Sequence, residues 1–259
     1  MSGDKLADIR VFLGRSGSGK GLAVRRAISE TKPKRLIVYD VYDEYGDLLD
    51  GVELVKLPEL ISRLKGLEYQ NGQDVGKLAG FAYRVMPGSG AGLFEKERDE
   101  FNFLCQVVFV VGALTFLAEE LSNVTSAVNP PAWWRKITSQ GRHRRLSVIG
   151  VSQRAAGIDK MLLTNATELR ASGFRYKEDC RASAVELGIS YDDVRLLRKE
   201  KIEGGAVCTA WRVLEDGVPV LVVTRVDGRG VKEVVVSYDE GSTLLRGGSI
   251  SGFFARGKK

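Results

Sequence analysis

The sequence predicts an α/β fold with a mainly parallel central sheet flanked by helices and an antiparallel β-hairpin at one edge. Short apolar strands alternate with helical segments through most of the chain, the pattern of parallel strands joined by helical crossovers. From about residue 205 the sequence pattern changes to longer β-rich segments with an Asp-Gly turn between them. The chain has 259 residues, 44% of them apolar. This composition supplies a full core and excludes a disordered or fibrous protein.

The expected elements follow the apolar runs in order. A strand over 9–13 ends in a glycine-rich turn, and the helix after it, over 20–31, ends before Pro33 because the residue preceding a proline avoids the helical conformation. The next expected elements are a strand over 36–39, a helix over 57–67, a strand over 81–86, a helix over 133–139 and a strand over 146–151.

One uncharged stretch, from Phe101 to Ala118, is close in length to a membrane span. Polar side chains interrupt it, Gly112 breaks it in the middle, and two acids follow it directly. We therefore favour a buried helix over 94–111 and a buried strand over 114–118.

The C-terminal part predicts an antiparallel edge. Strands are expected over 206–214 and 218–226, separated by an Asp-Gly turn, with a third strand over 231–236. We expect a single domain over residues 1–245, with its β-rich edge at about 205–236. A basic tail rich in glycine and serine follows over 246–259.

Charge and cysteine content narrow the function class. The chain has 39 Lys and Arg against 33 Asp and Glu, a net charge of +6 that permits an anionic partner. Its three cysteines are far apart and it has one histidine, so neither a disulfide framework nor a zinc site is expected. We expect a reducing compartment. The charged residues near the start argue against Sec export.

The strongest functional signal is the glycine-rich segment between the first strand and the first helix. Glycines let backbone N–H groups wrap around phosphates, the helix N-terminus adds its positive dipole end, and the lysine reaches the β- and γ-phosphates. The pattern Gly-x4-Gly-Lys thus predicts an ATP-binding P-loop. Its expected nucleotide-binding residues are Gly14, Arg15, Ser16, Gly17, Ser18, Gly19, Lys20, Gly21 and Leu22.

The residue after the P-loop lysine departs from the usual pattern. Gly21 stands where a serine or threonine normally binds Mg²⁺. Three explanations stay open. The metal relies on water and a distant carboxylate, or Ser16 or Ser18 compensates, or hydrolysis is weak.

Two adjacent acids follow the buried strand over 114–118. Glu119 is expected to hold Mg²⁺ through water, and Glu120 to orient the water that attacks the γ-phosphate. The alternative is a pair of acids at an exposed helix start without a chemical role.

Two further candidates flank the strand over 146–151. Gln153 follows it, and three interpretations are open: it senses the γ-phosphate, it holds the water, or it is a surface residue. Arg142, Arg144 and Arg145 precede it. This basic cluster is interpreted in three ways: it contacts DNA phosphates, it supplies an arginine finger to a neighbouring subunit, or it is a solvated face.

The order of these motifs resembles the FtsK/HerA superfamily of DNA-pumping ATPases. It is most similar to the genome-packaging ATPases of tailless icosahedral viruses with an internal membrane, the tectivirus-like group. Asp40, Glu44 and Tyr45 are similar to the acid and the Glu-Tyr pair after the family's second strand. The segment from Gly141-Arg142 to Gln153-Arg154 is similar to the family's Gly-Arg, strand, Ser-Gln-Arg segment. The resemblance covers about residues 8–226.

This resemblance implies a P-loop NTPase fold of the RecA/FtsK type. It also implies a hexameric ring that binds ATP and Mg²⁺ between subunits and double-stranded DNA in its pore, and that packages a viral genome into a preformed capsid. Capsid-vertex or membrane proteins are the further partners. The implied location is the packaging vertex of the virion or the host cytoplasm, peripheral to a membrane.

The resemblance also implies roles for the residues of this chain that match the family's motifs. Lys20 binds phosphate, Glu119 and Glu120 serve the metal and the water, and Gln153 is the sensor. One arginine among Arg142, Arg144 and Arg145 acts in trans. Gly21 departs from the family's pattern, as does Glu119, which stands in place of Asp. Both departures bear on magnesium coordination and on the catalytic rate.

Three alternative functions remain at this point. A plasmid- or filamentous-phage-type ATPase for DNA transfer or virion extrusion would need a membrane anchor. A small-molecule P-loop kinase would need an acceptor pocket and an arginine-bearing lid. A nucleotide-dependent scaffold that does not hydrolyse ATP is compatible with Gly21.

Overall fold

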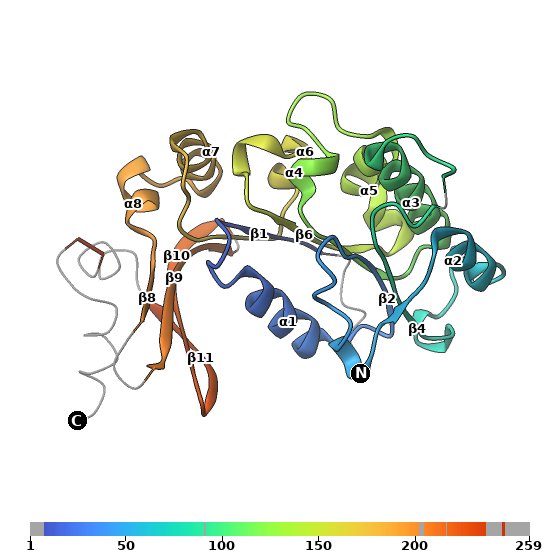
Figure 1. Ribbon diagram of the computed structural model, residues 1–259, viewed down its shortest axis with the longest axis horizontal. Coiled ribbons are helices and arrows are strands. Elements are labelled where there is room, and N and C mark those ends of the chain that lie inside the picture. Colours follow the sequence, from blue (N-terminus) through green and yellow to red (C-terminus); the bar gives the residue numbers. More distant parts are fainter. Residues whose placement is uncertain (1–7, 91, 202–204, 216, 237–244, 247–259) are drawn as a thin grey trace. The chain divides into compact units, whose positions relative to one another are not determined.

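The computed structural model describes residues 8–90, 92–201, 205–215, 217–236 and 245–246 (Figure 1). Its contacts divide the chain into two compact units. Of the described residues, the first contains those within 8–11, 21–152 and 158–166, and the second contains those within 12–20, 153–157 and 167–246.

A parallel sheet forms the centre of the first unit. Its pairs β5–β6, β2–β5, β2–β4 and β3–β4 are all parallel. Tyr39 of β2 is in register with Ala118 of β5, so the residues that follow them, Asp40 and Glu119, leave the sheet at the same edge. The strands follow one another in the order β1 (Ile9–Leu13, whose last residues belong to the second unit), β6 (Ser147–Ser152), β5 (Thr115–Ala118), β2 (Arg35–Tyr39), β4 (Phe81–Val85) and β3 (Glu53–Leu54).

Helices cover both faces of this sheet. Helix α1 (Lys20–Thr31) lies on one face, and α3 (Glu97–Val111) and α5 (Ala132–Gln140) lie together on the other (Figure 1). The remaining helices of the unit are α2 (Leu57–Leu64), α4 (Leu121–Val124), α6 (Lys160–Thr164) and the short 3-10 helices η1 (Leu48–Asp50), η2 (Val75–Lys77) and η3 (Gly141–Arg144).

Aromatic side chains fill the core between the sheet and the α3–α5 layer. The Trp134 ring is fully buried, with its centroid 5.5 Å from that of Phe101 and 6.3 Å from that of Phe116. Burial of such rings supplies much of the hydrophobic stabilisation of a domain. Trp134 is therefore a packing element.

The second unit is built on an antiparallel sheet. Strands β9 (Val207–Glu215), β10 (Val218–Asp227) and β11 (Gly230–Val236) form successive antiparallel pairs, and β7 (Glu168–Ala171) and β8 (Lys199–Lys201) both pair with β9. Helices α7 (Lys177–Leu187) and α8 (Tyr191–Leu196) pack on this sheet. Their shared core includes Cys180, Ala184, Val194, Cys208, Leu221 and Val223.

The predicted fold class is confirmed, since the structure is α/β with a mainly parallel sheet, flanking helices and an antiparallel hairpin edge. The uncharged stretch is a buried helix and strand, α3 and β5, although α3 begins at Glu97 instead of residue 94. Among the described residues, no helix is long and apolar enough to cross a membrane. The single domain over 1–245 stays a prediction, and residues 247–259 of the expected tail are outside the described part of the chain.

Several elements escaped the sequence-based prediction. Strand β8 has the sequence Lys-Glu-Lys, and β7 carries two charged side chains among its four residues. Neither shows the apolar run or alternation from which strands are predicted. Pairing with β9 determines their conformation instead.

Candidate functional site

The P-loop, residues 14–20, belongs to the second unit and has the backbone that its glycines predict. Gly14, Gly17 and Gly19 all have positive φ angles. At Gly14 a side chain is excluded twice, because φ is +148° and an added Cβ would lie 2.9 Å from the Ser18 hydroxyl oxygen. The loop therefore keeps its close internal packing only with glycine at this position.

Two ammonium groups lie on the P-loop. Lys20 Nζ donates to the carbonyl oxygens of Gly14 at 2.7 Å and of Arg15 at 3.1 Å. Lys199 Nζ, from β8, donates to the carbonyl oxygen of Gly17 at 2.9 Å. The loop thus combines backbone amides with two positive charges, the combination that binds phosphate.

The two residues that follow β7, together with residues of β9, support the loop. Gly173 accepts a hydrogen bond from the Arg15 N–H at 3.0 Å, and the Ser172 hydroxyl donates to the carbonyl oxygen of Ala210 at 3.0 Å. An added Cβ on Gly19 would lie 3.6 Å from both Thr209 and Trp211. The Ser18 hydroxyl is buried without a hydrogen-bond partner in the described part of the chain, whereas Ser16 is exposed.

Acidic side chains gather in the first unit where β2 and β5 end. Asp40 is fully buried and accepts hydrogen bonds from the N–H groups of Glu44 at 2.9 Å and Tyr45 at 3.1 Å. These bonds close a turn over residues 40–45, which we call the acidic turn. Arg84 Nη1 lies 3.4 Å from Asp40 and also pairs with Asp43. The buried Asp40 is therefore charge-compensated and fixes the shape of the turn.

Glu119 faces the acidic turn with one oxygen satisfied and one not. Its Oε1 accepts a hydrogen bond from the Tyr45 hydroxyl at 3.4 Å. Its Oε2 is buried and has no hydrogen-bond partner among the described residues, and the whole residue is only 5% exposed. A buried carboxylate oxygen without a partner carries a large desolvation cost that a bound cation removes.

The electrostatics of Glu119 follow from this packing. Burial first, and then the negative charges of Glu44 and Asp40, raise the pKa of Glu119 to about 7, against hydrogen bonds from the backbone of Tyr42 and Val41 that lower it. Mg²⁺ is typically held by one or two carboxylates together with nucleotide phosphates and water. In the described residues, no group of three His, Cys, Asp or Glu side chains is placed to hold a metal by itself. The donors fit Mg²⁺ that arrives with a nucleotide.

Gly21, the residue after the P-loop lysine, lies beside the acidic turn. Apart from α1's own backbone and the adjoining residues, a Cβ added to Gly21 would meet one atom of the described residues within 4 Å, Glu44 Oε2 at 3.6 Å. A carboxylate thus occupies the neighbourhood where P-loop proteins usually place a serine or threonine hydroxyl.

Glu120 is buried, with 5% exposure, and has an unusual backbone. Its φ and ψ angles of 46° and 50° are left-handed, a conformation that costs a residue other than glycine about 1 kcal/mol. Its Oε1 accepts a hydrogen bond from the Ser122 hydroxyl at 2.9 Å. Backbone strain of this kind concentrates at functional sites, which supports Glu120 as the candidate that orients water.

The three arginines of the basic cluster differ in their surroundings. Arg144 donates to the carbonyl oxygens of Phe109 at 3.1 Å and Val110 at 2.6 Å, in the last turn of α3. Its charge stabilises the C-terminal end of that helix. Arg142 and Arg145 are exposed. Arg144 therefore has a structural role, and the proposed trans contact is better served by Arg142 or Arg145.

The segment after β6 contains Gln153 and belongs to the second unit. Arg154, the next residue, pairs with the buried Asp179 at 2.9 Å and lies 4.5 Å from the centroid of the Tyr176 ring. Asp179 also accepts the N–H of Ala156 at 3.0 Å. These contacts attach the segment to α7, and the sensor role of Gln153 stays a prediction.

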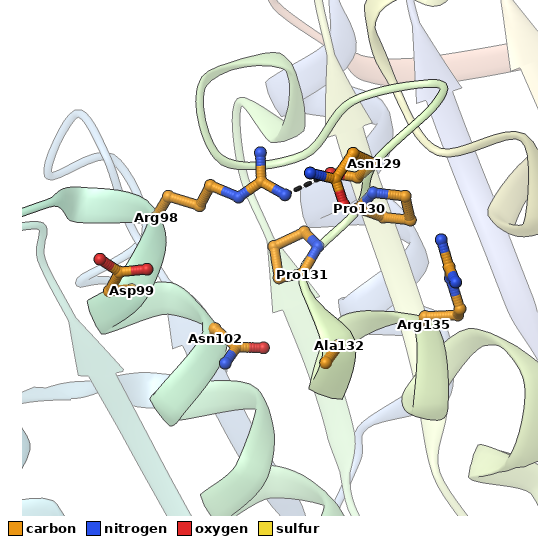
Figure 2. A pocket seen from close by; sticks show the side chains of 8 residues that line it. All are labelled: Arg98, Asp99, Asn102, Asn129, Pro130, Pro131, Ala132 and Arg135. Carbon is orange, nitrogen blue, oxygen red and sulfur yellow. Dashed lines mark hydrogen bonds between the residues drawn. The ribbon is translucent and has the colours of Figure 1, made fainter.

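A cavity of about 300 Å³ lies between α3 and the start of α5 (Figure 2). Arg98 donates to the carbonyl oxygen of Asn129, and Asn102 accepts the N–H of Trp133 at 2.9 Å. The exposed Arg135 guanidinium makes no hydrogen bond to the described residues. The lining residues are Arg98, Asp99, Asn102, Asn129, Pro130, Pro131, Ala132 and Arg135.

No protein-family model and no curated protein matches this sequence. Solved structures match over most of the chain. The genome packaging NTPase B204 from Sulfolobus turreted icosahedral virus 2, in complex with ATPγS, has a TM-score of 0.53 at 16% identity, covering 88% of this chain and 97% of that one. For B204, the DNA-packaging ATPase from Sulfolobus turreted icosahedral virus, the TM-score is 0.54 at 13% identity, with coverages of 86% and 98%.

VirB4 of Thermoanaerobacter pseudethanolicus is similar to the same degree. Its TM-score is 0.55 at 12% identity, and the match covers 91% of this chain and 90% of that one. At such identities the likeness establishes the fold. The fold is that of the P-loop NTPases, as the motif order implied.

Proposed function

We propose that this chain, with its FtsK/HerA-type P-loop fold, is an ATP-driven double-stranded DNA translocase that packages a viral genome into a preformed capsid. The observation that carries the ATPase part is the position of Lys20, whose ammonium group lies on the carbonyl oxygens of its own glycine-rich loop. The packaging part is supported by a match that spans 97% of a genome packaging NTPase.

In this proposal the P-loop binds the β- and γ-phosphates of ATP. Backbone N–H groups of residues 14–20 and the N-terminus of α1 provide donors, and Lys20 and Lys199 exchange their carbonyl contacts for phosphate oxygens. Lys199 adds a second charge from outside the motif, so two lysines share the negative charge of the triphosphate.

The acids serve hydrolysis. Bound Mg²⁺ would neutralise charge that develops on the phosphates, and Glu119, whose Oε2 lacks a partner among the described residues, would hold its hydration shell. Glu120 would orient the attacking water and accept its proton. Gln153 would report the γ-phosphate to α7, because the neighbouring Arg154 is paired with Asp179.

We further propose a hexameric ring with ATP between subunits and double-stranded DNA in the pore. Arg142 or Arg145 would reach the nucleotide of the neighbouring subunit. Arg135, exposed beside the α3–α5 cavity, is a candidate contact for DNA phosphates. Capsid-vertex or membrane proteins would recruit the ring, either at the virion vertex or in the host cytoplasm.

A DNA-transfer ATPase of the plasmid or filamentous-phage type is the second candidate. The likeness to VirB4, with a TM-score of 0.55 over 91% of this chain, favours it as much as the packaging match favours the first. Both candidates hydrolyse ATP and move DNA. They differ in how they are recruited, by a capsid vertex or by a membrane anchor.

Steady-state ATP hydrolysis with and without double-stranded DNA tests the proposal. We expect DNA to stimulate the assembled wild type, and Lys20→Ala and Glu120→Gln each to abolish turnover. Phosphate release that ignores both substitutions would place the active site elsewhere. Hydrolysis that needs Lys20 but never responds to DNA, under every assembly condition, would contradict a translocase.

A further inference from the structure

We propose that Glu44 supplies the Mg²⁺ ligand that is missing at Gly21. The inference rests on the proposed ATPase function. P-loop proteins hold the nucleotide's Mg²⁺ with the hydroxyl that follows the motif lysine, and this chain has a glycine there. A carboxylate oxygen is an equally suitable ligand for a hard cation, and it adds the charge that a hydroxyl lacks.

The geometry around Gly21 places this carboxylate where it is needed. Glu44 Oε2 lies 3.6 Å from the position that a Cβ on Gly21 would take, and outside the backbone of α1 and the adjoining residues no other described atom lies within 4 Å of that position. A serine or threonine hydroxyl is one bond beyond such a Cβ. The Glu44 carboxylate and the missing hydroxyl would therefore occupy neighbouring space.

The backbone of Glu44 is fixed from two sides. Asp40 accepts its N–H at 2.9 Å, which holds the acidic turn against the end of β2. Arg25 donates to its carbonyl oxygen and pairs with Asp47 at 2.5 Å. Residues 21 and 25 are one turn apart on the same face of α1. Helix α1 thus carries Gly21 and, through Arg25, also holds Glu44, the residue proposed to supply the Mg²⁺ ligand that is missing at Gly21.

An independent observation points to a cation at this place. Glu119 Oε2 is buried and lacks a hydrogen-bond partner in the described part of the chain, on a side chain that faces the acidic turn through Tyr45. Two carboxylates, one bound directly and one through water, are the complement that Mg²⁺ usually takes from a protein when phosphates supply the remaining oxygens.

Metal binding in the presence of nucleotide separates this role from others. The probe is Mn²⁺, measured by electron paramagnetic resonance on full-length protein saturated with ATPγS. Because a lost ligand typically weakens metal binding by about tenfold or more, we expect that reduction in Mn²⁺ affinity for Glu44→Gln. ATPγS affinity in EDTA should stay within about twofold of wild type, since the P-loop is unchanged.

Asp43→Asn is the matched control. It removes the same charge from the adjacent residue of the acidic turn, which pairs with Arg84 instead of facing Gly21. We expect its Mn²⁺ affinity to stay within about threefold of wild type, because it loses only a screened charge. An equal loss in both variants would mean a general field effect and would overturn the assignment.

A rescue experiment makes the test specific to the missing hydroxyl. Gly21 is helical and an added Cβ meets only ordinary contact distances, so Gly21→Ser is sterically permitted. Gly21→Ser combined with Glu44→Gln should recover most of the Mn²⁺ affinity that Glu44→Gln loses. No recovery would overturn the proposal.

Two further results would contradict it. Wild-type Mn²⁺ affinity in Glu44→Gln, together with lost hydrolysis, would make Glu44 a base instead of a ligand. If wild type fails to bind ATPγS in EDTA, or if Lys20→Ala binds it equally well, the proposed function fails first and the metal ligand fails with it.

Discussion

In the proposed function, the P-loop and the acidic turn would bind opposite charges with different parts of the chain. In the P-loop the backbone is the binding surface, and lysines from positions 20 and 199 reinforce it. In the acidic turn the N–H groups of Glu44 and Tyr45 are used to close the turn on Asp40, so the carboxylate side chains are the binding surface. Backbone shape should therefore control phosphate binding, and side-chain chemistry should control metal binding.

The largest expected effect is at the lysines of the P-loop. Charge-assisted hydrogen bonds contribute about 1.5–3 kcal/mol each, so Lys20→Ala should weaken ATPγS binding by about 100-fold. Lys199→Ala should weaken it by about tenfold, because Lys199 holds one P-loop carbonyl oxygen and Lys20 holds two. Isothermal titration calorimetry in EDTA measures both. A larger loss at Lys199 would reverse the assigned roles.

Glycine substitutions test the claim that backbone shape controls phosphate binding. Gly14→Ala combines a φ of +148° with a Cβ placed 2.9 Å from Ser18. Gly17→Ala meets a φ of +73°, and beyond the adjoining residues no described atom lies within 4 Å of its Cβ. Unfavourable φ angles cost about 1–2 kcal/mol, and the contact adds to that cost only at Gly14. We expect Gly14→Ala to reduce ATPγS affinity at least tenfold and Gly17→Ala to reduce it less. Equal losses would mean that packing against Ser18 is irrelevant.

A substitution in the acidic turn should have its effect on stability and metal binding. Asp40→Asn removes the negative charge of the carboxylate that accepts hydrogen bonds from two N–H groups and pairs with Arg84. We expect a loss of about 2–3 kcal/mol in the free energy of unfolding, measured by urea denaturation, because Arg84 loses its buried partner. ATPγS affinity in EDTA should remain within about threefold of wild type. A tenfold loss of that affinity would show that the turn also shapes the phosphate site.

The smallest expected effect is on DNA binding. Arg135→Gln removes one exposed charge beside the α3–α5 cavity. One lost phosphate contact should lower the slope of log affinity against log salt by about 0.9. Fluorescence anisotropy with duplex DNA at several salt concentrations measures the slope. Arg144→Gln is an unsuitable control, because it would remove the hydrogen bond that Arg144 donates to a carbonyl oxygen at the end of α3. An unchanged slope would remove Arg135 from the DNA surface.

The difference between the two regions also explains what the sequence could predict. The P-loop is a contiguous motif whose glycines set its backbone, and the structure places the Lys20 ammonium group on two carbonyl oxygens of that loop. Glu119 was predicted because it ends a buried strand. The position of Glu44 beside Gly21 depends on how α1 packs against the acidic turn, and no local pattern encodes that distance. The sequence placed Glu44 within the family resemblance without a role.

Two other residues show the same limit. Lys199 is 182 residues from Gly17, whose carbonyl oxygen it binds, and it lies on a short charged strand that has no apolar pattern. Arg144 belongs to a basic cluster whose arginines the sequence alone does not assign to different roles. Only the contact with the end of α3 distinguishes it as structural. Long-range contacts, rather than composition, separate functional from structural charges here.

The most direct test of the central claim is displacement of a triplex-forming oligonucleotide from double-stranded DNA by the assembled wild-type protein. A DNA translocase moving along the duplex strips the third strand. We predict displacement with ATP and Mg²⁺, and none with ATPγS or with Glu120→Gln. Hydrolysis of ATP by the wild type on the same DNA, without displacement of the third strand, would contradict the account.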